Sequence, residues 1–142
     1  MPDTHVTAEI QVVRDFLEAL ERLDIDAAVA LLDDRAVYQN VPLPAARGRE
    51  AVAKQLRWLA RYGSDFEARI HNIASDGAVV LTERTDVIEI GRLRADFWVC
   101  GTFEVRDGKI ALWRDYFDFV DVTWAFLRAG LRALVGLASA KR

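Results

Sequence analysis

Apolar side chains recur every three or four positions in four stretches of the chain, which is the spacing of one face of an amphipathic helix. These stretches predict helices over residues 7–23, 24–32, 49–61 and 121–137. Thr7 is a suitable N-cap for the first helix, and Asp24 or Asp26 for the short second one, because a side-chain oxygen there can accept from free backbone N–H groups.

Between the last two of these helices the pattern changes to alternation, with many β-branched and aromatic residues. It predicts strands over residues 66–74, 78–90, 93–105 and 110–119. Asp-Gly pairs at 76–77 and 107–108 are hairpin signals, and a Gly-Arg pair at 91–92 makes the remaining turn. A short earlier strand over residues 36–41 is stopped by Pro42 and Pro44.

Helices followed by a meander of strands predict one α+β domain over residues 1–142. We expect a strongly curved sheet, antiparallel or mixed, that packs on the N-terminal helices as a cone and is followed by a C-terminal helix. The central positions of such a sheet face the interior of the cone, so inward side chains of the strands are the candidates for a site.

A charged pair lies within the longest apolar strand. Arg84 and Asp86 are two positions apart, so they point to the same face as Val80 and Ile88. Charges on an apolar face are costly to bury unless they are paired. Taken alone, such a pair is more often a structural ion pair than a functional group.

Three more polar side chains are expected in the same interior. Asp115 shares a face with Trp113 and Phe117, and Tyr38 shares one with Asn40. Burial and the mutual repulsion of the two carboxylates raise the pKa of one of them, while the arginine keeps the other ionised. An acid and a base then coexist near neutral pH, which suits a reaction that takes a proton from water and gives one to a leaving oxygen. No serine–histidine or cysteine–histidine arrangement is suggested, so we do not expect a covalent intermediate.

Composition narrows the functional class. The chain has 142 residues and a net charge of −3, which argues against nucleic-acid binding. Cys100 is the only cysteine, which fits a reducing compartment, and the first residues lack the features of a signal peptide, so we expect a cytoplasmic protein. The apolar stretch 122–138 is interrupted by Arg128 and Arg132, which argues against stable membrane insertion.

Three segments resemble the limonene-1,2-epoxide hydrolase family in sequence, order and spacing: YQNVPLP at 38–44, LTERTDV at 81–87 and LWRDYFD at 112–118. The resemblance covers about residues 8–120. FWVCGTFEV at 97–105 and the apolar tail resemble the mycobacterial branch more than the terpene-epoxide branch. The resemblance implies the cone fold also seen in nuclear transport factor 2, usually as a homodimer.

The same resemblance implies a role for each polar residue. Asp115 is the general base on a water molecule, which Tyr38 and Asn40 help to hold. Asp86 is the general acid that protonates the epoxide oxygen, and Arg84 bridges the two aspartates. The product is a trans-type vicinal diol formed in one step with no metal or cofactor.

The substrate and two other readings stay open. The tail departs from the terpene-epoxide branch, so terpene, cyclic aliphatic, fatty-acid and sterol epoxides all fit. An isomerase or cyclase on the same cone needs one base and an oxyanion donor, and a non-catalytic binder of an apolar ligand needs no buried carboxylate pair. The expected apolar wall consists of Leu17, Leu20, Leu59, Ile88, Phe97, Val99, Phe117 and Val122.

Several other polar and aromatic residues, and the single cysteine, are expected outside the site. Alternation turns Glu83, Thr85, Arg114 and Asp118 outward, as interstrand or dimer-interface pairs. Cys100 is expected opposite the pocket face, buried and inert, and His71 is expected to be structural. Packing or interface roles are expected for Trp58, Trp98 and Trp124. The C-terminal helix is expected to cover the mouth of the cone or to form the dimer interface.

Overall fold

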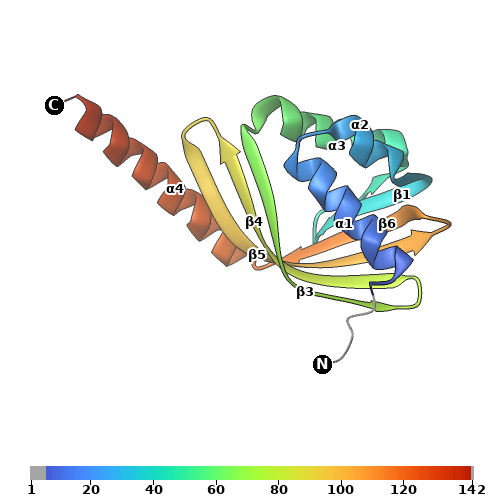
Figure 1. The fold of residues 1–142 in the computed structure, drawn as a ribbon. Helices are drawn as coiled ribbons and strands as arrows, with labels where there is room; N and C mark the ends of the chain where they lie inside the picture. The colour runs from blue at the N-terminus through green and yellow to red at the C-terminus, as the bar shows by residue number, and fades with distance from the viewer. Residues whose placement is uncertain (1–5, 142) are drawn as a thin grey trace.

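A six-stranded sheet curves around the N-terminal helices in the computed structural model, which describes residues 6–141 (Figure 1). The helices are α1 (Ala8–Glu21), α2 (Ile25–Ala30), α3 (Arg49–Tyr62) and α4 (Phe119–Ala140). The strands are β1 (Leu32–Val41), β2 (Ala46–Arg47), β3 (Asp65–Asp76), β4 (Val79–Ile90), β5 (Leu93–Arg106) and β6 (Lys109–Phe117). This arrangement confirms the predicted fold class.

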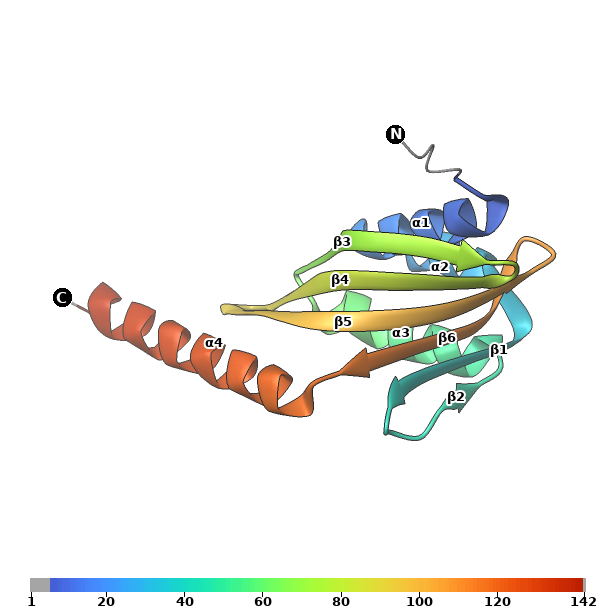
Figure 2. The ribbon, with the colours of Figure 1, turned by 90° about the horizontal axis from the view of Figure 1, so that it is seen from below.

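The strands lie in the order β2-β1-β6-β5-β4-β3 (Figure 2). β3 to β6 form the predicted antiparallel meander, and β1 joins it parallel to β6. This parallel pairing places Tyr38 opposite Trp113 and Asn40 opposite Asp115. A strand from the first third of the chain is thereby aligned with the last strand of the sheet.

The apolar face of α1 supplies much of the core. Its N-cap Thr7 accepts from the backbone N–H of Ile10 at 3.2 Å, and the predicted apolar positions from Ile10 to Leu20 are buried. Phe16 is fully buried and meets Phe103 and Trp113 edge-on, with ring centroids 6.4 and 5.0 Å away. Burial of each large apolar side chain contributes about 1.5–3 kcal/mol.

Much of the core lies at one end of the cone. Four of its strand residues come from the start of β4, the end of β5 and the start of β6: Val80, Phe103, Val105 and Ile110. Phe66 and Ala68 of β3 extend it toward the other end. In an antiparallel meander the first four positions lie side by side, and the opposite ends of the same strands meet at the other end of the cone. That second end is free for a cavity.

Several element boundaries differ from the predictions, and three of them have a clear cause. The second helix ends at Ala30, and β1 begins at Leu32, because the buried Leu32 pairs with Ile110 of β6 and leaves no further helical turn. The last strand ends at Phe117. The outward pairing expected for Asp118 is wrong, because its carboxylate caps α4 and accepts from the backbone N–H of the residues at 120 and 121.

α4 extends away from the cone (Figure 1). At its contact with β5, the small residues Ala125 and Ala129 pack against Ala95. The Phe126 ring of α4 lies 6.4 Å from that of Phe97. The side facing away from the sheet exposes Val120, Trp124, Leu127, Leu131, Leu134 and Val135. Within residues 6–141, no helix has the length and apolar character needed to cross a membrane.

Candidate active site

The site is built on a row of residues that are paired across four neighbouring strands. The sheet register aligns Thr82 of β4 with Gly101 of β5, Gly101 with Asp115 of β6, and Asp115 with Asn40 of β1. Because Gly101 has no side chain, the row has a gap on its inner face. The guanidinium group of Arg84 fills this gap, so a Cβ at position 101 would lie 2.5 Å from its Nη1 atom.

Arg84 joins the two aspartates from behind. It is fully buried, and its Nε and Nη2 atoms donate to the two carboxylate oxygens of Asp86 at 2.7 and 3.1 Å. The same Nη2 atom donates to Oδ2 of Asp115 at 2.7 Å, and Nη1 donates to the Thr82 hydroxyl at 3.2 Å. Oxygens of both carboxylates therefore lie against one guanidinium nitrogen, and the predicted burial of the charged pair is correct.

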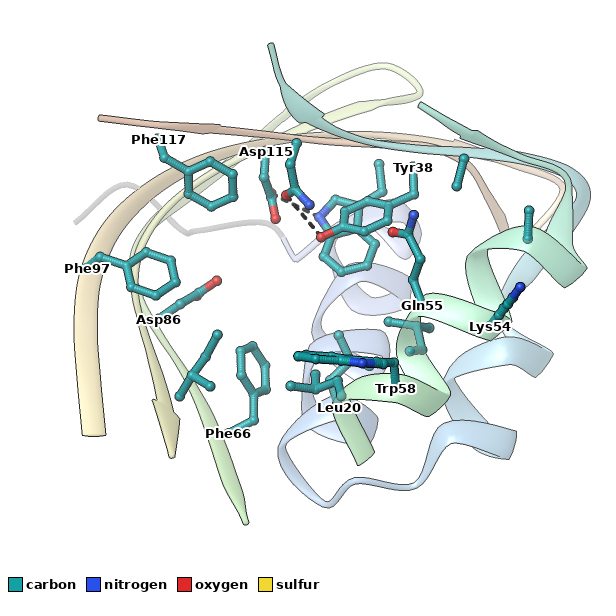
Figure 3. A pocket seen from close by; sticks show the side chains of 17 residues that line it. Leu20, Tyr38, Lys54, Gln55, Trp58, Phe66, Asp86, Phe97, Asp115 and Phe117 are labelled. Atoms are coloured by element: carbon teal, nitrogen blue, oxygen red, sulfur yellow. Dashed lines mark hydrogen bonds between the residues drawn. The ribbon is translucent and has the colours of Figure 1, made fainter. Parts of the chain in front are cut away.

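Asp115 and Tyr38 line one cavity (Figure 3), and Asn40, the register partner of Asp115, lines the same cavity. Oδ1 of Asp115 accepts from Nε1–H of Trp113 at 2.9 Å. The Tyr38 hydroxyl donates to the side-chain oxygen of Asn40 at 3.0 Å, and its ring stacks on the Trp113 indole with centroids 3.9 Å apart. Among the described residues, every fully buried side-chain nitrogen or oxygen has a hydrogen-bond partner.

Burial sets the protonation of the site. It raises the pKa of Asp115 to about 6, although Arg84 opposes the rise, and it raises the pKa of Asp86 for the same reason. Burial also works against the charge on Arg84, but Asp115 and Asp86 outweigh it and raise the pKa of the guanidinium. Desolvation and the charge of Asp115 raise the pKa of Tyr38, so the phenol stays neutral. The site combines a fixed cation with two carboxyl groups that bind protons more readily than exposed ones do.

Asp86, Asp115, Tyr38 and Asn40 face a cavity of about 700 Å³, whereas Arg84 lies behind its wall. The rest of the wall is mainly apolar and aromatic, as Figure 3 shows. Five of the residues expected on the wall line the cavity: Leu20, Leu59, Ile88, Phe97 and Phe117. The cavity thus places a small polar centre inside an apolar chamber, which is the usual composition of a small-molecule site.

Three of the expected wall residues lie elsewhere, so these expectations are wrong. Leu17 of α1 is buried in the core and does not line the cavity. Val99 is fully buried between its register partners Arg84 and Phe117. Val122 lies in α4, and no described residue of that helix lines the cavity, so α4 does not cover it.

Of the residues of α3 on the wall, only Leu59 was expected there. Ala51, Gln55, Trp58 and Leu59 are spaced as one helical face, and all four line the cavity. Trp58 was expected in a packing or interface role, yet it lines the cavity and keeps 57% of its surface exposed. The sequence showed the helical spacing of these residues. It could not show that a cavity lies between this face of α3 and the sheet. Other wall residues not expected there are Ala46, Lys54, Leu56, Phe66 and Trp113.

The outer face of the sheet carries interstrand polar pairs, as predicted for Glu83 and Thr85. Glu83 accepts from Nδ2 of Asn72 at 2.7 Å and from Nε1 of Trp98 at 3.0 Å. Thr85 contacts the His71 ring nitrogen at 2.8 Å. Cys100 pairs with Glu83 on this face, but the burial expected for it is wrong, because it is half-exposed at this surface. Within residues 6–141, no group of three or more His, Cys, Asp or Glu side chains is placed to hold a metal ion.

A curved sheet around helices, with two acids facing an apolar cavity and an arginine behind its wall, places the protein in the nuclear transport factor 2-like fold class. Such a protein of unknown function from Burkholderia pseudomallei shares this fold with a TM-score of 0.74 at 15% identity, over 84% of this chain and 98% of that one. At this identity the likeness concerns the fold alone.

A model of the limonene-1,2-epoxide hydrolase catalytic domain matches residues 7–128, and the chain belongs to this family. It is 53% identical to epoxide hydrolase EphG of Mycobacterium tuberculosis over 124 residues, which are 87% of this chain and 81% of that protein. The structure of an epoxide hydrolase of this type from the same organism matches with a TM-score of 0.85 at 47% identity, over 91% of this chain and 96% of that one. The resemblance to the mycobacterial branch is confirmed, and the chain is an epoxide hydrolase of this type.

The geometry around Gly101 predicts that Gly101→Ala damages the site. The added Cβ would lie 2.5 Å from Nη1 of Arg84, 2.7 Å from the Thr82 hydroxyl and 3.0 Å from Oδ1 of Asp115. Overpacking of this kind costs about 1–3 kcal/mol of the free energy of unfolding. Displacement of the guanidinium should lower epoxide hydrolysis about 100-fold. Urea unfolding and initial rates measure the two effects.

Gly130→Ala is the matched control. Gly130 lies in α4 with no atom within 4 Å of an added Cβ, so the substitution should leave the rate unchanged and stabilise the helix slightly. Wild-type stability and rate in Gly101→Ala would show that the gap at position 101 is not needed.

Proposed function

We propose that this epoxide hydrolase adds water to an apolar epoxide in one step, with Asp115 as general base and Asp86 as general acid. The observation that carries the proposal is the Nη2 atom of Arg84, which donates to both carboxylates where they face the apolar cavity. One nitrogen between two acids holds them at neighbouring points, so one can act on water while the other acts on the epoxide oxygen.

Asp115, Tyr38 and Asn40 form the water site of this mechanism. The Tyr38 hydroxyl donates to the side-chain oxygen of Asn40, which leaves the amide N–H groups of Asn40 to donate to a water oxygen. The water then points one proton at the ionised Asp115. As the water oxygen forms its bond to an epoxide carbon, Asp115 takes that proton.

Asp86 acts on the oxygen of the epoxide ring. Its proton passes to the epoxide oxygen as the carbon–oxygen bond breaks, so the product is a vicinal diol with no charge left on it. A bound epoxide and water select this distribution, because a proton on Asp115 would leave the water without an acceptor. With one proton shared between the acids, Arg84 balances the remaining negative charge. After the reaction Asp115 holds the proton that Asp86 needs, and solvent in the open cavity can return it.

The second carboxylate favours this chemistry over the alternatives. An isomerase or cyclase would use one base beside a carbonyl and would have no role for a second acid held to the first by Arg84. A non-catalytic binder would carry the desolvation of both carboxylates without any benefit.

The wall of the cavity supports an apolar substrate. Phe66, Phe97, Phe117 and Ile88 offer no hydrogen-bonding groups, and the volume of about 700 Å³ is in the range of sites for medium-sized organic molecules. Terpene, cyclic aliphatic, fatty-acid and sterol epoxides are the classes to compare. The mechanism needs no metal or cofactor, because the three charged side chains supply the acid, the base and the balancing charge.

We further propose a cytoplasmic homodimer. The apolar side chains exposed on α4, with Trp124 and Leu131 among them, are suited to contact with a second copy. A single cysteine, Cys100, fits a reducing compartment.

A panel of epoxides of increasing size tests the substrate class. We expect diol formation from apolar epoxides and little from small polar ones, because the wall gains free energy only from apolar surface, by roughly 25 cal/mol per Å². Product analysis by gas chromatography measures this, with Asp115→Asn as the enzyme blank. Preference for a polar epoxide would contradict the assignment. Isomerisation of a carbonyl steroid with no epoxide opened would favour the isomerase.

Asp115→Asn and Asp86→Asn test the two roles. Each removes a proton-transfer group while keeping its shape, so each should lower kcat about 100-fold to 10,000-fold with the fold intact. Asp96→Asn, at an exposed position of β5, should leave kcat unchanged. Near-normal turnover in either site variant would contradict its role. In a single turnover in oxygen-18 water the diol should carry the label, and label found first in an aspartate would show a covalent ester instead.

The raised pKa values predict a displaced pH profile. Asp115 must be ionised to act as a base, so kcat/KM should fall below about pH 6, where Asp115 takes up its proton. Asp86 must be protonated to act as an acid, so the rate should also fall at higher pH, where the pair of aspartates loses the proton that it shares. Initial rates across the pH range should trace a bell. An acid limb near pH 4, where an exposed aspartate titrates, would contradict the proposed base.

A further inference from the structure

We infer that Trp113 is a positioning residue for the water site, fixing the carboxylate of Asp115 and the ring of Tyr38 through one buried indole. This inference rests on the proposed function for its consequence in the reaction, but its geometry is independent of any substrate. It adds to the site a side chain that carries no charge and has no acidic group.

The first contact is with the base. Oδ1 of Asp115 accepts from Nε1–H of Trp113 at 2.9 Å, and Oδ2 accepts from Nη2 of Arg84 at 2.7 Å. With one donor on each oxygen, the carboxylate cannot rotate without losing a hydrogen bond. Each oxygen has a second lone pair, so the plane in which Asp115 can accept from a water is fixed by Trp113 and Arg84 together.

The second contact is with the hydroxyl that helps to hold the water. The ring of Tyr38 stacks on the indole, with centroids 3.9 Å apart and an angle of 24° between the planes. Its hydroxyl then reaches Asn40 at 3.0 Å. Tyr38 and Trp113 are register partners on the parallel strands β1 and β6, so backbone pairing and ring stacking hold them in the same relation.

The indole itself is rigidly held. Trp113 is 5% exposed, stacks on Phe103 with 9° between the rings, and meets Phe16 edge-on at 5.0 Å. These partners belong to the core. The core therefore holds the Trp113 indole in one position beside Asp115 and Tyr38. A pre-organised site requires side chains that are fixed in this way.

Other groups also act on Asp115 and must be separated from the effect of Trp113. Arg84 and Asp86 face it from β4, Tyr38 faces it from β1, and Lys54 of α3 lines the same cavity. None of these changes in a variant that removes only the indole N–H. An N–H donor favours the ionised carboxylate, so its loss should raise the pKa of Asp115.

Trp113→Phe tests this inference, and the chain offers a matched control. Trp98 also donates its Nε1–H to a carboxylate, that of Glu83 at 3.0 Å, but on the outer face of the sheet. In carbon-13 NMR titrations, with the Asp115 signal assigned by its loss in Asp115→Asn, Trp113→Phe should raise the pKa of Asp115 by about one unit. The acid limb of kcat/KM should move by the same amount, with kcat affected more than KM. Trp98→Phe should change neither.

A second variant separates the hydrogen bond from packing. Benzothienylalanine in place of Trp113 keeps the bicyclic shape and the stacking but carries sulfur where the N–H was. It should reproduce the pKa rise, and it decides the question if Trp113→Phe fails to fold by circular dichroism. An unchanged titration of Asp115 in the folded variant would overturn the inference. Absence of epoxide opening by the wild-type protein would instead defeat the proposed function, and the titration would still decide the role of Trp113.

Discussion

One buried guanidinium shared between two carboxylates is the interaction on which the rest of the site depends. Arg84 has no exposed surface, and both Asp86 and Asp115 are almost fully buried beside it. Neither acid could stay ionised at this depth without its cation, because an unpaired buried charge costs several kcal/mol. Neither could serve the proposed chemistry if the cation were free to move. The fold must therefore hold all three groups in place at once. The register of the sheet and the glycine at position 101 make this possible.

The sheet meets this demand through register. Asp86 and Asp115 lie on β4 and β6, with all of β5 between them, and the side chain of Arg84 must cross that strand. It can do so only because position 101 of β5 is glycine, whose missing Cβ leaves the space that the guanidinium occupies. The parallel pairing of β1 with β6 then adds Tyr38 and Asn40 to the same inner face. A one-residue slip in either pairing would turn these side chains outward and break the site.

The sequence was sufficient for the parts of this design that follow from local pattern. Alternation placed Arg84 and Asp86 on one inner face, and the helical spacing of α1 identified its buried side. The family resemblance added that Tyr38 and Asp115 belong to the same site, which the spacing of apolar and polar residues could not show. The wall was harder to predict, because lining depends on where the core stops. Leu17 and Leu20 lie on the same side of one helix, yet only Leu20 reaches the cavity. That difference is set by the curvature of the sheet, which no single residue encodes.

Arginine is the cation that this arrangement requires, and the reason lies in the number of its donors. Arg84 uses Nε and Nη2 for Asp86, Nη2 again for Asp115, and Nη1 for Thr82, so every nitrogen of its planar fork has a partner. A lysine offers three donors from a single point and could not span two carboxylates and a hydroxyl in fixed directions. It could also lose its proton to a neighbouring carboxylate in an apolar chamber, whereas a guanidinium keeps its charge. The fixed charge makes the proton count of the aspartates the only variable of the site. Two acids that compete for one proton beside an unchanging cation are the condition under which one of them can be an acid and the other a base.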